Sequence, residues 1–262
     1  MFSFDPGGQP LLVSFPHSST RIPDPVAAVM TGEGRAVPDT DWFLPELYDF
    51  VRELGVSVIA AGFSRYVIDP NRGTDGVNLY PGRPTPELCP LLSFAGEEIY
   101  LPGRQPDPFE IGRRTAEYWQ PLHDRIQAEL TRLRHRFGRA VLFDAHSIRS
   151  QVPRLFEGVL PDINIGTHNG QSCAESLEQV IRDVLGGRDD CSHVINGRFQ
   201  GGYITRHYGQ PAENIHAVQL ELAQLRYMDE ETGKWDDERA GRVRPILQAI
   251  VEAVLEWSKQ PV

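Results

Sequence analysis

Two histidines follow apolar runs that we expect to form strands. His17 stands two residues after the run 11–15, and His146 stands three residues after the run 140–143. The carboxyl ends of parallel strands meet in one crevice of an α/β sheet, so these side chains can share a metal ion. A catalytic zinc takes three protein ligands, commonly with histidine among them, and keeps one position for water. The sequence therefore predicts a zinc site that needs one more ligand, although each histidine could instead be structural.

The best candidate for the third ligand is Asp41, and Asp39 is its alternative. Asp39 precedes a predicted helix at residues 41–54, and Asp41 is the first residue of that helix. Because an aspartate at a helix start is equally explained by capping, a structural role stays open for both. Asp144 lies two residues before His146 and could hold that imidazole through a hydrogen bond.

A second group of polar residues could bind and activate a carboxylic acid derivative. Arg65 and Arg72 flank a short apolar run, and Asn71 places an amide beside the Arg72 guanidinium, a geometry suited to a carboxylate. The alternative for these residues is a surface salt bridge. Glu221 lies inside an apolar alternation, where a carboxylate is costly unless it has a partner or a task such as general base.

Other catalytic classes have weaker support. The chain has no H-E-x-x-H motif, and Ser64, which stands where a nucleophile-elbow serine would, lacks the closing glycine of that motif. Three cysteines, Cys89, Cys173 and Cys191, form no C-x-x-C pair, which disfavours both a disulfide framework and a cysteine zinc site. Reduced thiols of this kind are typical of a cytoplasmic protein.

The elements that must position these residues alternate between strand and helix. Strands are predicted at residues 11–15, 56–60, 66–68, 140–143, 162–165 and 215–222, and helices at 41–54, 109–137, 171–185 and 236–259. This alternation predicts a layered α/β/α fold with a mixed, partly parallel central sheet. We expect a single domain over residues 1–262, with a segment at 73–108 that contains seven prolines and covers the site.

Composition excludes several classes of partner. The 26 Lys and Arg residues against 36 Asp and Glu give a net charge of −10, which disfavours nucleic-acid binding. The N-terminus lacks the pattern of a secretory signal, and no run approaches the roughly 20 apolar residues of a membrane helix. We expect a cytoplasmic enzyme whose partner is a small molecule, and the sequence leaves the oligomeric state open.

In their order along the chain, these residues resemble the N-formylglutamate amidohydrolase family. The resemblance rests on Pro16-His17-Ser18, Asp39-Thr40-Asp41-Trp42, Ser64-Arg65-Tyr66, Asp69-Pro70-Asn71-Arg72, Asp144-Ala145-His146-Ser147, the stretch from Gly201 to Gly209, and Gln219-Leu220-Glu221. More distantly, the set is similar to zinc carboxypeptidases and aspartoacylase, which implies a carboxypeptidase-like fold. Zinc carboxypeptidases take a carboxylate ligand three residues after the first histidine, but Thr20 stands there in this chain, so Asp41 would have to replace it.

The resemblance also implies a role for each residue. His17 and His146 would bind zinc, Arg65 would stabilise an oxyanion, Asn71 and Arg72 would hold the substrate carboxylate, and Glu221 would be the base. Arg149, Arg198 and Arg206 remain for a second carboxylate, with Arg206 preferred because glycines bound its stretch. Tyr203 and His207 could contact the substrate but are expected to pack or cap, and His123 and His135 are expected to lie on a solvated helix face.

The activity that the resemblance implies is zinc-dependent hydrolysis of N-formyl-L-glutamate to formate and L-glutamate, a step of histidine degradation. A related deacylase or carboxypeptidase-like hydrolase with another N-acyl amino acid or peptide as substrate is the first alternative. A non-catalytic carboxylate-binding protein is the alternative from another class, and another divalent metal could replace zinc.

Overall fold

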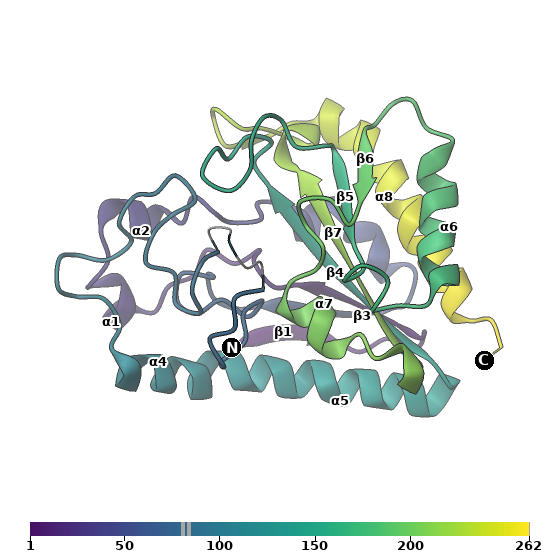
Figure 1. Ribbon diagram of the computed structural model, residues 1–262, viewed down its shortest axis with the longest axis horizontal. Coiled ribbons are helices and arrows are strands. Elements are labelled where there is room, and N and C mark those ends of the chain that lie inside the picture. Colours follow the sequence, from purple (N-terminus) through teal and green to yellow (C-terminus); the bar gives the residue numbers. More distant parts are fainter. Residues whose placement is uncertain (80–81, 83–84, 262) are drawn as a thin grey trace.

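The computed structural model describes residues 1–79, 82 and 85–261, and its centre is one mixed sheet (Figure 1). Its strands lie in the order β1-β3-β2-β4-β7-β5-β6. Their bounds are β1 Phe2–Asp5, β2 Leu11–Phe15, β3 Ser57–Ala61, β4 Ala140–Ile148, β5 Ile163–Gly166, β6 His193–Ile195 and β7 Ile215–Ala223. Strands β3, β2, β4 and β7 are parallel, whereas β1 and β5 run antiparallel to β3 and β7. The prediction of a mixed, partly parallel sheet is therefore confirmed.

Helices cover both faces of this sheet. Because neighbouring strand residues point to opposite faces, Leu12 and Leu142 pack with the apolar side of α5 (Gln120–Phe137), beside α7 (Tyr203–Tyr208). Leu11 and Phe143 point the other way, into a core shared with α3 (Leu44–Leu47), α6 (Glu175–Gly186) and α8 (Asp237–Ser258). Each fully buried side chain of this kind contributes roughly 1.5–3 kcal/mol. In Figure 1, α5 runs along one side of the sheet and α6 and α8 lie on the other, which confirms the single-domain layered fold.

Three of the predicted helices form near their expected places. Residues 109–137 become α4 (Pro108–Arg114), a π-helical turn at Thr115–Trp119 and α5. Pro121 accounts for the π turn, because it has no N–H to donate to the carbonyl four residues earlier. The last helix begins where the Asp236 side chain accepts from the backbone N–H groups of Glu238 and Arg239.

The predicted helix at 41–54 is largely wrong. Only α3 and a 3₁₀ turn at Asp49–Arg52 form, since Phe43 has φ 58° and interrupts any helix that begins at Asp41. The predicted strand at 66–68 is also wrong. Tyr66 and Val67 are buried in turns, so burial rather than strand pairing explains that apolar run.

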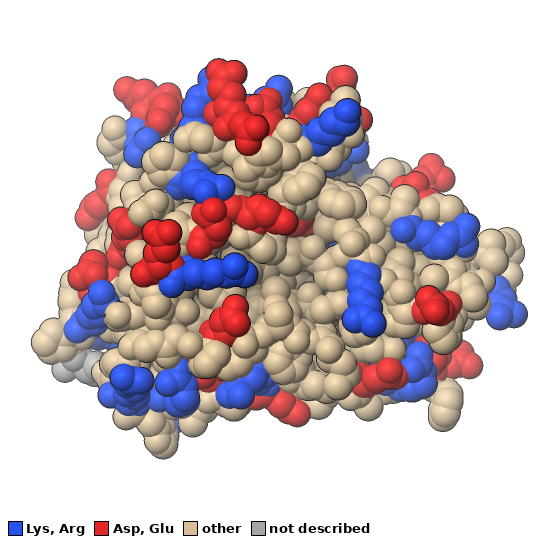
Figure 2. All heavy atoms as spheres, turned by 180° about the vertical axis from the view of Figure 1, so that it is seen from behind, with Lys and Arg blue, Asp and Glu red and all other residues tan. Residues whose placement is uncertain are grey.

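Several elements were not predicted, namely β1, β6, α7, the short helices α1 (Asp24–Ala27) and α2 (Gly32–Ala36), the 3₁₀ turns Pro211–Glu213 and Gln224–Arg226, and the hairpin of β8 (Met228–Asp229) with β9 (Lys234–Trp235). The described part of segment 73–108 contains only isolated bridges before α4 begins, and Pro81 and Pro84 lie outside the described residues. Within the described chain, no helix has both the length and the apolar character needed to cross a membrane. Figure 2 shows acidic and basic side chains interspersed over one face of the molecule.

Candidate metal centre and active site

A row of polar side chains crosses the sheet at the carboxyl ends of its central strands. On the face that α5 covers, the residues change from apolar to polar along β2 (Leu12, then Ser14), β4 (Ala140 and Leu142, then Asp144 and His146) and β7 (Ile215 and Ala217, then Gln219 and Glu221). The strand register places His146 beside Glu221 and Asp144 beside both Ser14 and Gln219. Parallel pairing thus brings residues from distant parts of the chain to one level of the fold.

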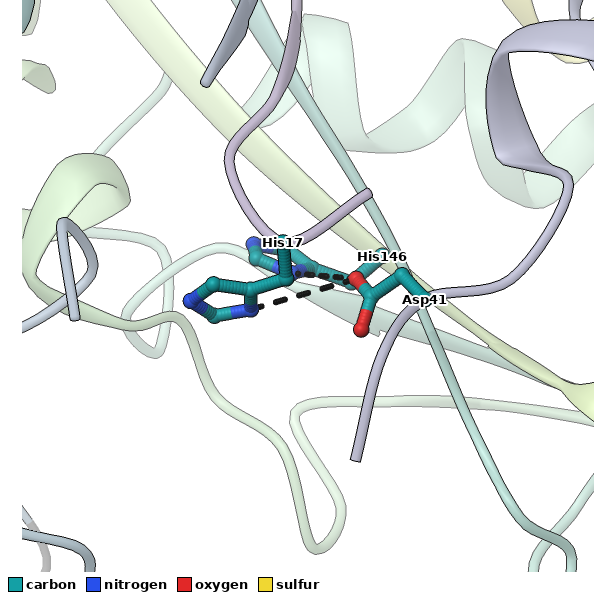
Figure 3. A group of neighbouring side chains, drawn as sticks. All are labelled: His17, Asp41 and His146. Carbon is teal, nitrogen blue, oxygen red and sulfur yellow. Dashed lines mark hydrogen bonds and ion pairs between the residues drawn. The ribbon is translucent and has the colours of Figure 1, made fainter. Parts of the chain in front are cut away.

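His17, Asp41 and His146 form a compact buried group. One ligand atom of each lies within 4.8 Å of the others. The Asp41 Oδ2 atom is 3.1 Å from Nδ1 of His146 and 3.9 Å from Nδ1 of His17 (Figure 3). Two imidazole nitrogens and a carboxylate oxygen are a donor set that zinc accepts. The structure therefore brings together the three residues expected to bind metal.

A second carboxylate lies behind each histidine. The Nε2 atom of His17 is 2.7 Å from Oδ1 of Asp69, and Nε2 of His146 is 2.9 Å from Oδ2 of Asp144. Because a carboxylate only accepts, each Nε2 carries a proton, and Nδ1 is the nitrogen that each ring turns toward Asp41. Carboxylates in this position fix the tautomer and orientation of metal-binding histidines.

Asp39 has a different role from Asp41. Its Oδ2 atom accepts from the Tyr66 hydroxyl at 2.6 Å and from the Phe94 backbone N–H at 2.8 Å. Asp41 instead donates its backbone N–H to the His17 carbonyl and accepts from the Ser147 N–H through its side chain. The geometry favours Asp41 as the carboxylate of the metal group, and Asp39 ties the segment around Phe94 to the fold.

A cavity opens beside the metal group. The residues that line it include His17, Arg65, Asn71, Arg72, His146, Arg198, Gln219 and Glu221, with Phe94, Ile148, Leu155 and Phe199 as an apolar wall.

Burial raises the pKa of Glu221 to about 8. Burial opposes protonation of His146, but Asp144 and Asp41 raise its pKa well above the ordinary value. Burial and the Arg65 charge lower the pKa of His17. The high pKa of His146 reflects a negative potential that suits a bound cation.

Arg65 and Asn71 are held in defined orientations at this cavity. Arg65 Nη2 donates to Asp69 Oδ2 at 2.6 Å, and its guanidinium lies 4.9 Å from the Phe94 ring centre. Asn71 Oδ1 accepts the Ile204 backbone N–H at 2.8 Å, which fixes Nδ2 on the side of His146. The Nδ2 atom lies 3.0 Å from Nε2 of His146, and because an amide NH₂ group has two hydrogens, one of them stays available to a ligand.

The three remaining arginines differ in whether they line the cavity. Arg198 lines the cavity and donates its Nε–H to the Leu155 carbonyl at 2.8 Å. Arg206 and Arg149 are absent from the described lining. Arg206 donates to the Gly201 and Leu79 carbonyls, and the exposed Arg149 donates to the Glu230 carbonyl. Of the candidates for a second carboxylate, the structure places only Arg198 at the cavity.

One histidine differs from its sequence-based prediction, and one aspartate had no predicted role. His123 was expected on a solvated face, but it is 4% exposed and packs between Trp119 and Tyr208. Tyr203 and His207 stack on each other, as expected of packing residues. Asp69 received no role, although a carboxylate immediately after the buried run 66–68 was a usable signal.

Comparison with protein families decides the classification. Residues 9–228 match the model of a family described as N-formylglutamate amidohydrolase. The chain belongs to this family. It is thus an enzyme of the amidohydrolase class, as the sequence predicts.

Individual relatives agree with this assignment. Two curated proteins named N-formylglutamate deformylase, from Pseudomonas putida and Pseudomonas aeruginosa, are each 47% identical over 261 residues. The alignments cover 99% of this chain and 97% and 98% of those proteins.

Solved structures support the fold. An N-formylglutamate amidohydrolase from Ralstonia eutropha superposes with a TM-score of 0.83 at 24% identity, covering 100% of this chain and 99% of that chain. A gene product of Agrobacterium tumefaciens gives 0.72 at 18% identity, covering 97% and 95%.

Proposed function

We propose that the protein hydrolyses N-formyl-L-glutamate to formate and L-glutamate with the help of a bound zinc ion. The observation that carries the proposal is one cavity lined by His17, His146, Glu221 and the Asn71–Arg72 pair. The names of the two Pseudomonas relatives support the choice of substrate. The route that this reaction would serve is histidine degradation, and free buried cysteines are compatible with a cytoplasmic enzyme.

The donor set of the metal group fits zinc. Asp69 and Asp144 fix both histidines with Nδ1 toward Asp41, so His17, His146 and Asp41 would hold the ion. When bound, zinc supplies Lewis-acid chemistry that activates water at neutral pH and polarises a carbonyl. The same donors could accept another divalent metal.

Glu221 would move the proton in this reaction. It accepts the proton of the attacking water and returns it to the departing amine of glutamate. A base that must hold and then release a proton works best with a pKa near the working pH, and burial raises the pKa of Glu221 to about 8.

Arg65 would stabilise the oxyanion that forms as the formyl carbon is attacked. Its Nε atom is buried and has no hydrogen-bond partner within the described chain, although it belongs to a cavity-lining residue. An unsatisfied buried donor costs roughly 1–3 kcal/mol, so a ligand oxygen that accepts from it is favoured. A donor placed before the reaction begins loses nothing to reorientation.

Two guanidinium groups would recognise the two carboxylates of the substrate. Arg72 and Asn71 would hold one carboxylate, and Arg198 would hold the second across the apolar wall formed by Leu155 and Phe199. Thr85, Pro86 and Phe94 of segment 73–108 also line the cavity. We therefore keep the proposal that this segment covers the bound substrate.

The test is formate release from N-formyl-L-glutamate by zinc-loaded protein, with a chelated sample, N-acetyl-L-aspartate and a short peptide in parallel. Chelator-sensitive turnover of the formyl substrate supports the proposal, and turnover of another substrate alone assigns a different deacylase. Glu221→Gln should abolish turnover while substrate still binds. Glu129→Gln removes another buried carboxylate, which lies on α5 and contacts Ser57 of β3 and Arg132, and this variant should retain activity. Binding without turnover by the unaltered protein would favour the non-catalytic alternative.

A further inference from the structure

Two ring N–H groups hold the backbone on either side of Asn71. The indole Nε1 of Trp119 donates to the Arg72 carbonyl at 2.9 Å. The imidazole Nε2 of His123 is 2.9 Å from the Pro70 carbonyl. The two rings stack with centres 3.7 Å apart, so they act as one support under the segment that contains Asn71 and Arg72.

The protonation of His123 is set by its surroundings. A carbonyl can only accept, so the proton on Nε2 is directed at Pro70. The Tyr208 hydroxyl lies 2.9 Å from Nδ1, and burial lowers the pKa of His123 to about 4. The imidazole is therefore a neutral donor at physiological pH, with a defined tautomer.

The local helix geometry presents both rings to this segment. Trp119 ends the π-helical turn Thr115–Trp119, and His123 follows in the first turn of α5 after Pro121. A π turn shifts the helix face by about one residue, and such turns frequently occur at functional sites. The π turn therefore allows α5 to pack against the sheet while both rings contact residues 70–72.

Other hydrogen bonds hold the rest of this stretch: the Arg72 N–H donates to the Asp69 carbonyl at 3.2 Å, and Arg72 Nη1 donates to the Asn71 carbonyl at 2.8 Å. The Asn71 N–H donates to Asp69 Oδ1 at 2.8 Å, and the Asn71 carbonyl accepts from the Tyr203 N–H at 3.3 Å. The carbonyls before and after Asn71 depend on His123 and Trp119. Loss of either ring N–H would leave one of these two carbonyls without that donor, so the backbone that carries the Asn71 and Arg72 side chains could shift.

We propose that Trp119 and His123 are positioning residues for the substrate carboxylate, acting through the backbone of residues 70–72 on the Asn71 amide and the Arg72 guanidinium. This inference rests on the proposed function of that pair. A contact to a non-reacting carboxylate is equally strong in the ground state and the transition state, so its loss raises KM and leaves kcat unchanged.

The test uses variants that remove one N–H at a time in the zinc-loaded full chain. Trp119→Phe keeps the stacked ring and should raise KM for N-formyl-L-glutamate by about five- to tenfold, with kcat within about twofold. His123→Leu should do the same, and His123→Gln, which can place an amide N–H near the Nε2 position, should restore most of the loss.

Matched controls lie in the opposite layer. Trp257 is 4% exposed and its indole donates to Ser176 at 3.0 Å, so Trp257→Phe removes an equivalent buried hydrogen bond. His216 is 3% exposed and accepts from the Ala174 N–H, so His216→Leu matches His123→Leu. Both controls should leave KM within about twofold even where they lower thermal stability.

A second readout separates this inference from the proposed function. The dissociation constant of L-glutamate, measured by calorimetry, should rise in Trp119→Phe and His123→Leu by the same factor as KM, with zinc content unchanged. Unchanged KM and glutamate affinity in both variants would overturn the positioning role, as would a fall in kcat alone. If the unaltered protein does not hydrolyse the formyl substrate, the proposed function fails. The glutamate titration then decides the positioning role by itself, and a lack of glutamate binding to the unaltered protein would overturn it.

Discussion

Asp69 accepts hydrogen bonds from three groups that serve different parts of the site. Oδ1 lies 2.7 Å from His17 Nε2 and 2.8 Å from the Asn71 N–H, and Oδ2 accepts from Arg65 at 2.6 Å. Asp69 is fully buried and Arg65 is 7% exposed. Burial alone would raise the pKa of Asp69, but Arg65, His17 and Arg72 hold it well below the ordinary value. The carboxylate is therefore charged at every pH at which the enzyme would work.

Asp69→Asn tests this arrangement because an asparagine of the same shape cannot satisfy all three donors. If its oxygen faces His17 and Asn71, its NH₂ group faces the buried Arg65 guanidinium. Removal of one partner from a buried ion pair costs about 3–5 kcal/mol of folding stability. His17 also loses a charged acceptor, and loss of such a partner lowers metal affinity by roughly 10–100-fold.

Stability is measured by urea unfolding in the presence of chelator, and zinc affinity by competition with a chromophoric chelator. The control is Asp49→Asn, which breaks the ion pair of Asp49 with Arg244 at 2.7 Å. That Asp49 side chain is 57% exposed, so its loss should cost less than about 1 kcal/mol and leave zinc affinity unchanged. If Asp69→Asn matched this control in both measurements, Asp69 would not link Arg65 to the metal site.

Three further predictions concern the substrate, the pH dependence and the backbone. Arg198→Leu should raise KM for N-formyl-L-glutamate about tenfold or more but change KM for N-formyl-L-alanine little. The control Arg149→Leu should change KM for neither substrate. Equal increases in KM for both substrates would contradict a contact between Arg198 and the side-chain carboxylate. Burial lowers the pKa of His123 to about 4, so the unfolded chain binds the proton more tightly between pH 6.5 and 4. Stability present above pH 6.5 should be lost as the pH falls through this window, by up to about 3 kcal/mol, and urea unfolding of His123→Gln should show a smaller loss. A Cβ at Gly202 would lie 2.4 Å from the Asn71 amide, so Gly202→Ala should displace that amide and raise KM in steady-state assays, and an unchanged KM would show that the backbone yields there instead.

Sequence patterns located the strand-end residues of the site well. His146 and Glu221 lie on apolar runs whose pairing is parallel, so the assumption that strand ends converge was sufficient to bring them together. His17 follows a run that pairs with the strand of His146, and the same assumption applies. The choice between Asp41 and Asp39 required the three-dimensional structure. Two residues of separation in a loop do not indicate which side chain points toward the metal group.

Long-range packing decided the features that sequence could not supply. The apolar run at 66–68 is buried by tertiary packing and not by strand pairing. One of its tertiary contacts is the hydrogen bond from the Tyr100 hydroxyl to the Tyr66 carbonyl. His123 stands among arginines in sequence, but the π turn before it changes which residues face inward. Neither effect has a periodic signal in the chain itself.

The change from apolar to polar residues along the central strands implies an uneven tolerance to protein engineering. Buried charged residues such as Asp144 and Glu221 cost stability compared with apolar residues of similar volume. Substitutions that make this level of the sheet apolar would give a more thermostable but inactive protein. Improvements compatible with activity belong elsewhere, for example at Phe109, an apolar side chain that is 83% exposed at the start of α4. The amino-terminal halves of the same strands contribute to the core and to none of the chemistry, so apolar substitutions that conserve volume should be tolerated there.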